Sequence, residues 1–186
     1  MLKHSTTCVK EVRFSETRAM TMTARTISTE ILGEVTYKSL GALGAGQLNS
    51  EVTLKTIPRK TKSGETKLIS AYNLFNENKA AIGFNASPSK ATNGVELYKV
   101  IYTTTIPENN RQYKTSGLLA IPNVPDRTLP LVSWQHGTEQ DPKDAPSELA
   151  RGGQIQRSPA GVPRSAETLF NVNSLAGNGY IVAAAD

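Results

Sequence analysis

The chain has 186 residues, enough for one domain with a hydrophobic core, and a composition of 38% hydrophobic and 20% charged residues excludes a wholly disordered or membrane-embedded protein. No apolar run approaches the roughly 20 residues of a spanning helix, and the N-terminus lacks the apolar stretch of a signal peptide, so localisation is left open. A single cysteine, Cys8, excludes an internal disulfide and a cysteine-based zinc site. We expect no cofactor and no metal.

The net charge of +5 raises the question of a nucleic-acid or anionic partner. The basic residues are scattered, apart from the run Arg59-Lys60-Thr61-Lys62 in a polar turn closed by Ser63-Gly64. Aromatic residues are few and do not alternate with the basic ones, which disfavours base stacking. We interpret the run as a solvated loop and expect no nucleic-acid partner.

The first half of the chain gives weak signals. Residues 1–28 are rich in Thr, Ser and Arg and predict a mobile leader. Residues 29–94 form a poorly defined N-terminal region. Within it, Gly41 to Gly46 is too glycine-rich to indicate a helix and does not match a dinucleotide-binding fingerprint. Residues 51–57 predict a weak strand, and residues 68–75 a short helix or strand.

Clear architecture begins at Val95. Residues 95–106 and 113–122 are rich in β-branched and aromatic side chains, and the turn between them contains proline and asparagine, so they predict an antiparallel hairpin. A third strand is predicted over residues 131–135, a short apolar run that begins after Pro130.

A polar loop with four prolines follows to about Arg164, either part of a substrate mouth or a disordered insertion. Ser165 predicts the N-cap of a helix over 166–176, with Gly177 and Gly179 as its C-terminal caps. Residues 180–185 form an apolar strand typical of buried parallel sheets. This strand, helix and strand form a βαβ unit, which places Gly137 and Asp186 at the same sheet edge.

Four segments carry a resemblance to a known family: Tyr98–Thr105, Thr115–Pro122, Pro130–Thr138 and Gly179–Asp186. They resemble the opening of the secretory-lipase type of α/β-hydrolase, over about residues 95–186. The resemblance implies the α/β class and a partial α/β-hydrolase fold, truncated before the nucleophile elbow. In such enzymes a serine on a G-x-S-x-G turn attacks an ester carbonyl, and an acid and a histidine follow in chain order. The implied substrate is a small-molecule or lipid ester.

The candidate site is the oxyanion segment His136-Gly137-Thr138 at the end of the third strand. Gly137 would permit the turn, the Thr138 N–H would donate to the developing oxyanion, and His136 would orient the turn rather than act as a base. The sequence contains no G-x-S-x-G, and its histidines are His4 and His136. Ser174, near the last strand, is expected in mid-helix. Nucleophile, acid and base are therefore absent from the mapped positions.

Two functions stay open at this point. The chain is the N-terminal portion of a serine esterase or lipase, inactive by itself, or it is a non-catalytic truncated product or small binding module. In the resembled fold, the strand over 180–185 lies between those over 113–122 and 131–135. The other edge of the third strand would then be unpaired, which predicts self-association through that edge.

Overall fold

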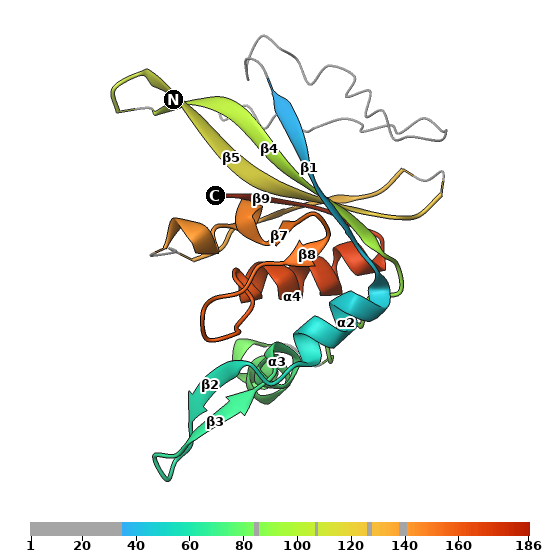
Figure 1. Ribbon diagram of the computed structural model, residues 1–186, viewed down its shortest axis with the longest axis vertical. Helices are drawn as coiled ribbons and strands as arrows, with labels where there is room; N and C mark the ends of the chain where they lie inside the picture. The colour runs from blue at the N-terminus through green and yellow to red at the C-terminus, as the bar shows by residue number, and fades with distance from the viewer. Residues whose placement is uncertain (1–34, 84–85, 107, 126–127, 138–140) are drawn as a thin grey trace.

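The computed structural model describes residues 35–186 except 84–85, 107, 126–127 and 138–140. The expected leader and Thr138 lie outside the described residues. The chain has a mixed α/β fold built on a five-stranded mixed sheet with the strand order β1-β4-β5-β9-β6. The helices lie on one side of this sheet (Figure 1). Its strands are β1 (Thr36–Leu43), β4 (Val95–Ile106), β5 (Arg111–Pro122), β6 (Leu131–Trp134) and β9 (Ile181–Ala185).

The predicted hairpin is confirmed. Strand β4 has the predicted bounds, β5 begins two residues earlier than expected, and the two pair antiparallel from Val95↔Pro122 to Ile106↔Arg111. Because successive side chains of a strand point to opposite faces, Leu97 enters the helix-side core while Tyr98 joins a small cluster on the other face.

The predicted strand–helix–strand unit is also confirmed. Strand β6 pairs in parallel with β9, and β9 pairs antiparallel with β5, so β9 lies between β5 and β6 as expected. The connection contains the helix α4 (Ala166–Ser174) and the 3-10 turn η4 (Ala176–Asn178).

The prediction of a weak strand over residues 51–57 was wrong for most of its length. Residues Ala45–Thr53 form the helix α2, because Leu48 and Val52 lie four residues apart and bury one helical face in the core. Residues 68–75 span the end of a strand and the start of a helix, which begins where the Ser70 hydroxyl accepts a hydrogen bond from Asn73 N at 3.1 Å. The elements here are β2 (Ile57–Lys60), β3 (Thr66–Ile69), α3 (Ala71–Asn78) and η1 (Lys79–Ile82).

Strand β1 pairs antiparallel with β4, and the buried side chains of α2 belong to the same core as those of β4, β5 and β9. Residues 36–54 therefore share one sheet and one core with the part of the chain after Val95. A functional division at residue 94 stays a prediction.

The polar loop after the third strand is ordered and packed over its described residues 141–164, so the alternative of a disordered insertion was wrong there. Leu149 and Ala150 are buried, and Gly153 N donates a hydrogen bond to Leu40 O of β1 at 2.8 Å. The segment thus adds buried side chains to the core, which its polar composition does not predict. The segment contains η2 (Pro142–Asp144), η3 (Pro146–Glu148), β7 (Ala150–Arg151) and β8 (Gln154–Ile155).

The predicted helix caps were confirmed in part. Ser165 is the N-cap residue of α4 as predicted, but its φ is 48°, and its hydroxyl donates to Asp144 O and makes no capping hydrogen bond. Gly177 lies buried inside η4, where a Cβ would come within 2.4 Å of Ala91 Cβ. Gly179 does end η4 as predicted, with φ 98°.

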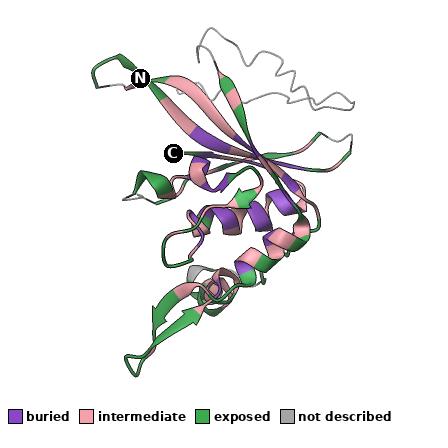
Figure 2. Cartoon of the chain, in the orientation of Figure 1, coloured by how far each residue is buried: buried purple, intermediate pink, exposed green. Residues whose placement is uncertain are grey.

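The main core lies between the sheet and the two helices α2 and α4 (Figure 2). Burial of each large apolar side chain contributes about 1.5–3 kcal/mol, so this layer dominates the stability. Its large buried residues are Leu40, Leu43, Leu48, Val52, Val95, Leu97, Leu118, Leu149, Leu169, Val172 and Val182.

Candidate functional site

The predicted site lies where β6 and β9 end. The parallel register runs from Leu131↔Ile181 to Trp134↔Ala184, so both strands finish at one edge of the sheet. Gly137 and Asp186 follow there, as predicted. The residues that follow the two parallel strands therefore lie at the same edge, which is where ligands bind in open α/β sheets.

The His136 side chain is held by two backbone carbonyls. Its Nε2 lies 2.8 Å from Ala185 O, at the end of β9, and its Nδ1 lies 2.5 Å from Gly137 O. A carbonyl only accepts hydrogen bonds, and a neutral imidazole carries one N–H. A neutral ring can therefore donate to only one of the two carbonyls, and both ring nitrogens lie against the backbone. The contact with Ala185 O links the segment after β6 to the end of β9, and the orienting role of His136 stays a prediction.

Gly137 is exposed, and a Cβ at this position would meet no described atom within 4 Å. Its φ is outside the left-handed region that favours glycine. The turn itself therefore gives no steric reason for glycine among the described residues. The structure thus does not support the expectation that the turn requires glycine here, and a role of Gly137 beside a ligand stays a prediction. Because Thr138 is outside the described residues, the direction of its N–H stays a prediction.

Asp186 makes the densest set of polar contacts at this edge. Its carboxylate accepts hydrogen bonds from Ser147 N at 2.8 Å, from Ser147 Oγ at 2.6 Å and from Ser116 Oγ. One side chain thereby joins the end of β9 to the middle of β5 and to η3. The sequence placed Asp186 at the edge but gave no sign of its partners, since the two serines are 39 and 70 residues away.

These serines do not form a catalytic relay with the described residues. Ser147 is 1% exposed, and both its N–H and its hydroxyl are directed at the Asp186 carboxylate. An activated serine needs a base such as an imidazole to take its proton, and the ring nitrogens of His136 are engaged elsewhere. The cluster acts as a structural clamp between strand ends.

Ion pairs fix the segment that covers the site edge. Lys99 of β4 contacts Glu148 at 2.7 Å, and Arg164 contacts Asp144 at 2.8 Å.

Trp134, at the end of β6, packs against the helix-side core, and its Nε1 is buried without a partner among the described residues. The tryptophan is thus directed inward, away from solvent.

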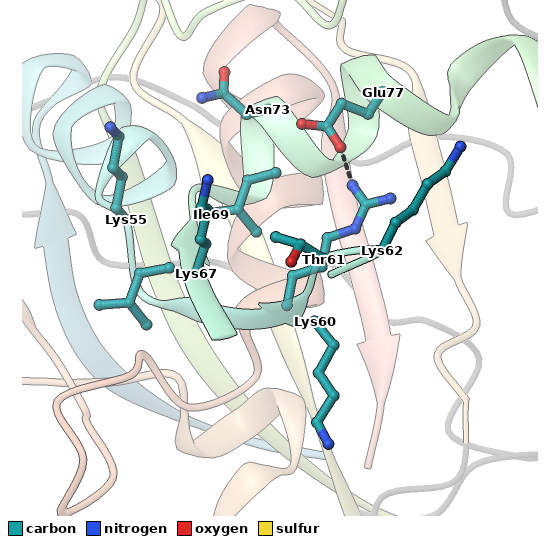
Figure 3. Close-up of a pocket in the computed structure, with 10 residues that line it drawn as sticks. Lys55, Lys60, Thr61, Lys62, Lys67, Ile69, Asn73 and Glu77 are labelled. Carbon is teal, nitrogen blue, oxygen red and sulfur yellow. Dashed lines mark hydrogen bonds and ion pairs between the residues drawn. The ribbon is translucent and has the colours of Figure 1, made fainter. Parts of the chain in front are cut away.

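A second feature lies far from these strand ends, between the hairpin β2–β3 and α3 (Figure 3). It is an open hollow of about 350 Å³, and five of its ten lining residues are basic. Arg59 of β2 pairs there with Glu77 of α3. The lining residues are Lys55, Arg59, Lys60, Thr61, Lys62, Lys67, Leu68, Ile69, Asn73 and Glu77.

Within the described ranges, no three His, Cys, Asp or Glu side chains gather closely enough to hold a metal ion. None of the helices that the structure describes has the length and apolar character needed to cross a membrane.

Comparison with known proteins gives one distant likeness. No family model and no curated protein matches the chain. A solved structure from Legionella pneumophila, described as a "putative hydrolase", is similar over 81% of this chain, with 19% sequence identity and a TM-score of 0.48. The match spans 29% of the length of that protein. The activity, substrates and partners of the present chain are therefore matters for proposal.

Proposed function

We propose that residues 95–186 belong to a carboxylic-ester hydrolase of the esterase or lipase type with an α/β-hydrolase fold, and that they provide one side of its oxyanion hole. The observation that carries the proposal is the strand arrangement. A hairpin leads into the order β5-β9-β6, β6 and β9 are parallel, and His136-Gly137 follows β6 at the shared edge.

Each residue of the segment has a distinct role in this proposal. When a nucleophile attacks an ester, the carbonyl oxygen gains negative charge, and fixed N–H donors stabilise it. Thr138 N–H supplies one donor, and an N–H after the nucleophile supplies the other. Gly137 leaves room for the substrate, and His136 holds the turn against β9. The clamp at Asp186 keeps η3 and β5 in place beside them.

The first test is the chain by itself. The printed sequence has no G-x-S-x-G, so its hydrolysis of short-chain nitrophenyl esters should not exceed that of a heat-denatured control. The reason is that loss of nucleophile and base removes a rate factor on the order of 10⁶. Turnover that is abolished by a serine-directed phosphonate would contradict the assignment of roles.

The second test needs any longer product of the same reading frame that encodes G-x-S-x-G. In that protein Thr138→Pro, which removes the N–H, should lower kcat by about 10²–10³. Thr138→Ala keeps the N–H and should leave kcat within a few-fold of the parent. Equal losses in the two variants would show that the side chain or the local fold, and not the N–H, matters.

A non-catalytic binding module is the second candidate. The observation that favours it is the absence of a nucleophile motif from the sequence. A genuine stop codon directly after codon 186 in the gene would support this candidate over the hydrolase.

A further inference from the structure

The hairpin β2–β3 extends from the α3 side of the molecule, away from the five-stranded sheet (Figure 1). Cross-strand partners lie on one face of a hairpin, so Pro58 and Leu68 share a face with the next-but-one pair, Lys60 and Thr66. All four residues are exposed, and Leu68 reaches 59% exposure, the highest among the exposed large hydrophobic residues of the described chain. This outer face therefore combines apolar and cationic groups in contact with solvent.

The opposite face of the hairpin is occupied. Arg59, which pairs across the strands with Lys67, forms an ion pair with Glu77 of α3. In Figure 3, Lys60 points away from α3. Ile57 and Ile69, at the base of the hairpin, are partly buried. The inner face thus contacts α3, whereas Lys60, Thr66 and Leu68 of the outer face stay exposed, with Lys60 and Leu68 also at the rim of the open hollow beside α3.

The charge of the hairpin is concentrated and largely unpaired. Residues 55–67 contain five basic residues and one acidic residue, Glu65, which gives a net charge of +4 against +5 for the whole chain. Arg59 has a carboxylate partner, but no ion pair holds the four lysines within the part of the chain that the structure describes. The four are Lys55, Lys60, Lys62 and Lys67.

We propose that this hairpin docks on an anionic lipid surface. Lys60 and Lys62 contact the headgroups, and Leu68 enters the boundary between headgroups and acyl chains, as the apolar face of an interfacial element does. Leu54, 41% exposed at the base of the hairpin, adds to the apolar contact. Nucleic acid fits less well because residues 55–69 contain no aromatic side chain for base stacking, and an exposed leucine gains nothing from phosphate contacts.

Co-sedimentation with vesicles tests this docking, independently of any esterase activity. The purified chain should sediment with phosphatidylcholine vesicles that contain phosphatidylserine and stay in solution with phosphatidylcholine alone. Lys60→Glu with Lys62→Glu should lower the partition coefficient at least 25-fold, at about fivefold for each lysine. Leu68→Ser should lower it about tenfold, because it removes the apolar contact while the charge is unchanged.

The matched control is Arg111→Glu with Lys114→Glu, which changes the net charge equally on the start of β5, away from the hairpin β2–β3 (Figure 1). It should reduce binding far less than the hairpin variant, with all variants checked for unchanged circular dichroism. Equal losses in both double variants, or full binding by Leu68→Ser, would overturn the proposal. So would preference for a single-stranded RNA oligonucleotide, or displacement by inorganic phosphate beyond that caused by chloride at equal ionic strength.

Discussion

At the scale of single residues, side chains far apart in sequence meet at the strand ends. Asp186 accepts three hydrogen bonds from Ser147 and Ser116, and His136 lies against the carbonyl of Ala185. Hydrogen bonds to a charged carboxylate contribute about 1.5–3 kcal/mol each, more than those between neutral groups. The candidate site is thus held by a few strong contacts on a sheet edge that is otherwise open.

Tyr98 predicts a specific dependence of stability on pH. Burial, and then the hydrogen bond from its hydroxyl to Glu96, raise the pKa of Tyr98 from 10.0 to about 12. The folded state therefore keeps this proton at pH values where the unfolded chain has lost it. Its contribution to stability is complete below about pH 10 and is lost as the pH rises to about 12, a loss of at most about 3 kcal/mol.

Urea unfolding from about pH 9 to about pH 12 measures this dependence. In Tyr98→Phe the decline over this range should be shallower than in the parent, because the group that titrates differently is gone. Tyr113→Phe, at an exposed tyrosine, should decline as the parent does. Parallel declines for the parent and Tyr98→Phe would show that another group governs the alkaline transition.

At the scale of elements, the contact between β1 and the turn from β7 to β8 depends on glycine. The register of β1 shifts between Ser39 and Gly41, which marks a bulge, and Gly41 has φ 96°. A Cβ there would lie 2.1 Å from Gly153 N, which donates to Leu40 O. The bulge lets two backbones approach and anchors the segment that follows the candidate site.

Gly41→Ala should therefore lower the free energy of unfolding by about 3 kcal/mol, through strain at a positive φ and the backbone clash. Gly46→Ala is the matched control, because Gly46 lies in α2 and its Cβ would meet no atom within 4 Å. That substitution should raise stability by about 0.5–1 kcal/mol through better helix propensity. Chemical denaturation compares the two, and similar effects would contradict the bulge as the reason for Gly41.

At the scale of the whole molecule, a buried amide network joins elements that the sequence leaves unrelated. Asn49 of α2 exchanges two hydrogen bonds with the backbone of Ala91, at 2.8 and 2.9 Å, and accepts one from Asn173 of α4 at 2.9 Å. The Asn49 side chain thereby bonds both the N–H and the C=O of Ala91, which lies before β4 and outside the described strands. Such a network costs more to break than its bonds contribute, because buried polar groups are left unsatisfied.

The free edge of β6 predicts the association state. β6 pairs with β9 on one side, no described strand pairs with its other side, and Leu131 is 45% exposed. An unguarded edge pairs with other chains. The chain should elute as a dimer or larger species at micromolar concentration, and Leu131→Lys should shift it toward monomer by placing a charge on that edge.

Size-exclusion chromatography with light scattering measures this shift. Tyr113→Lys, at a residue of similar exposure away from that edge, should leave the association unchanged. A parent chain that is monomeric and melts in one sharp transition would contradict the edge as an association surface.

The sequence determined the parts of the fold in which local pattern and tertiary environment agree. Strand β4 was predicted to the residue, and the parallel strands β6 and β9 were predicted within one residue, because β-branched and apolar runs favour a buried sheet wherever they are placed. The sheet edge shared by Gly137 and Asp186 followed from the strand–helix–strand order.

Only the tertiary structure decided the rest. Residues 51–53 belong to the helix α2 although their weak alternation predicts a strand, because the helix buries Leu48 and Val52 in the core. The polar segment 141–164 is held by partners on β1 and β4 and by Ser165, just before α4, that no local signal indicates. Likewise, Asp186 contacts Ser147 and Ser116, which precede it in the sequence by 39 and 70 positions. Local sequence sets which conformation each segment prefers, whereas contacts between distant segments exist only once the chain has folded.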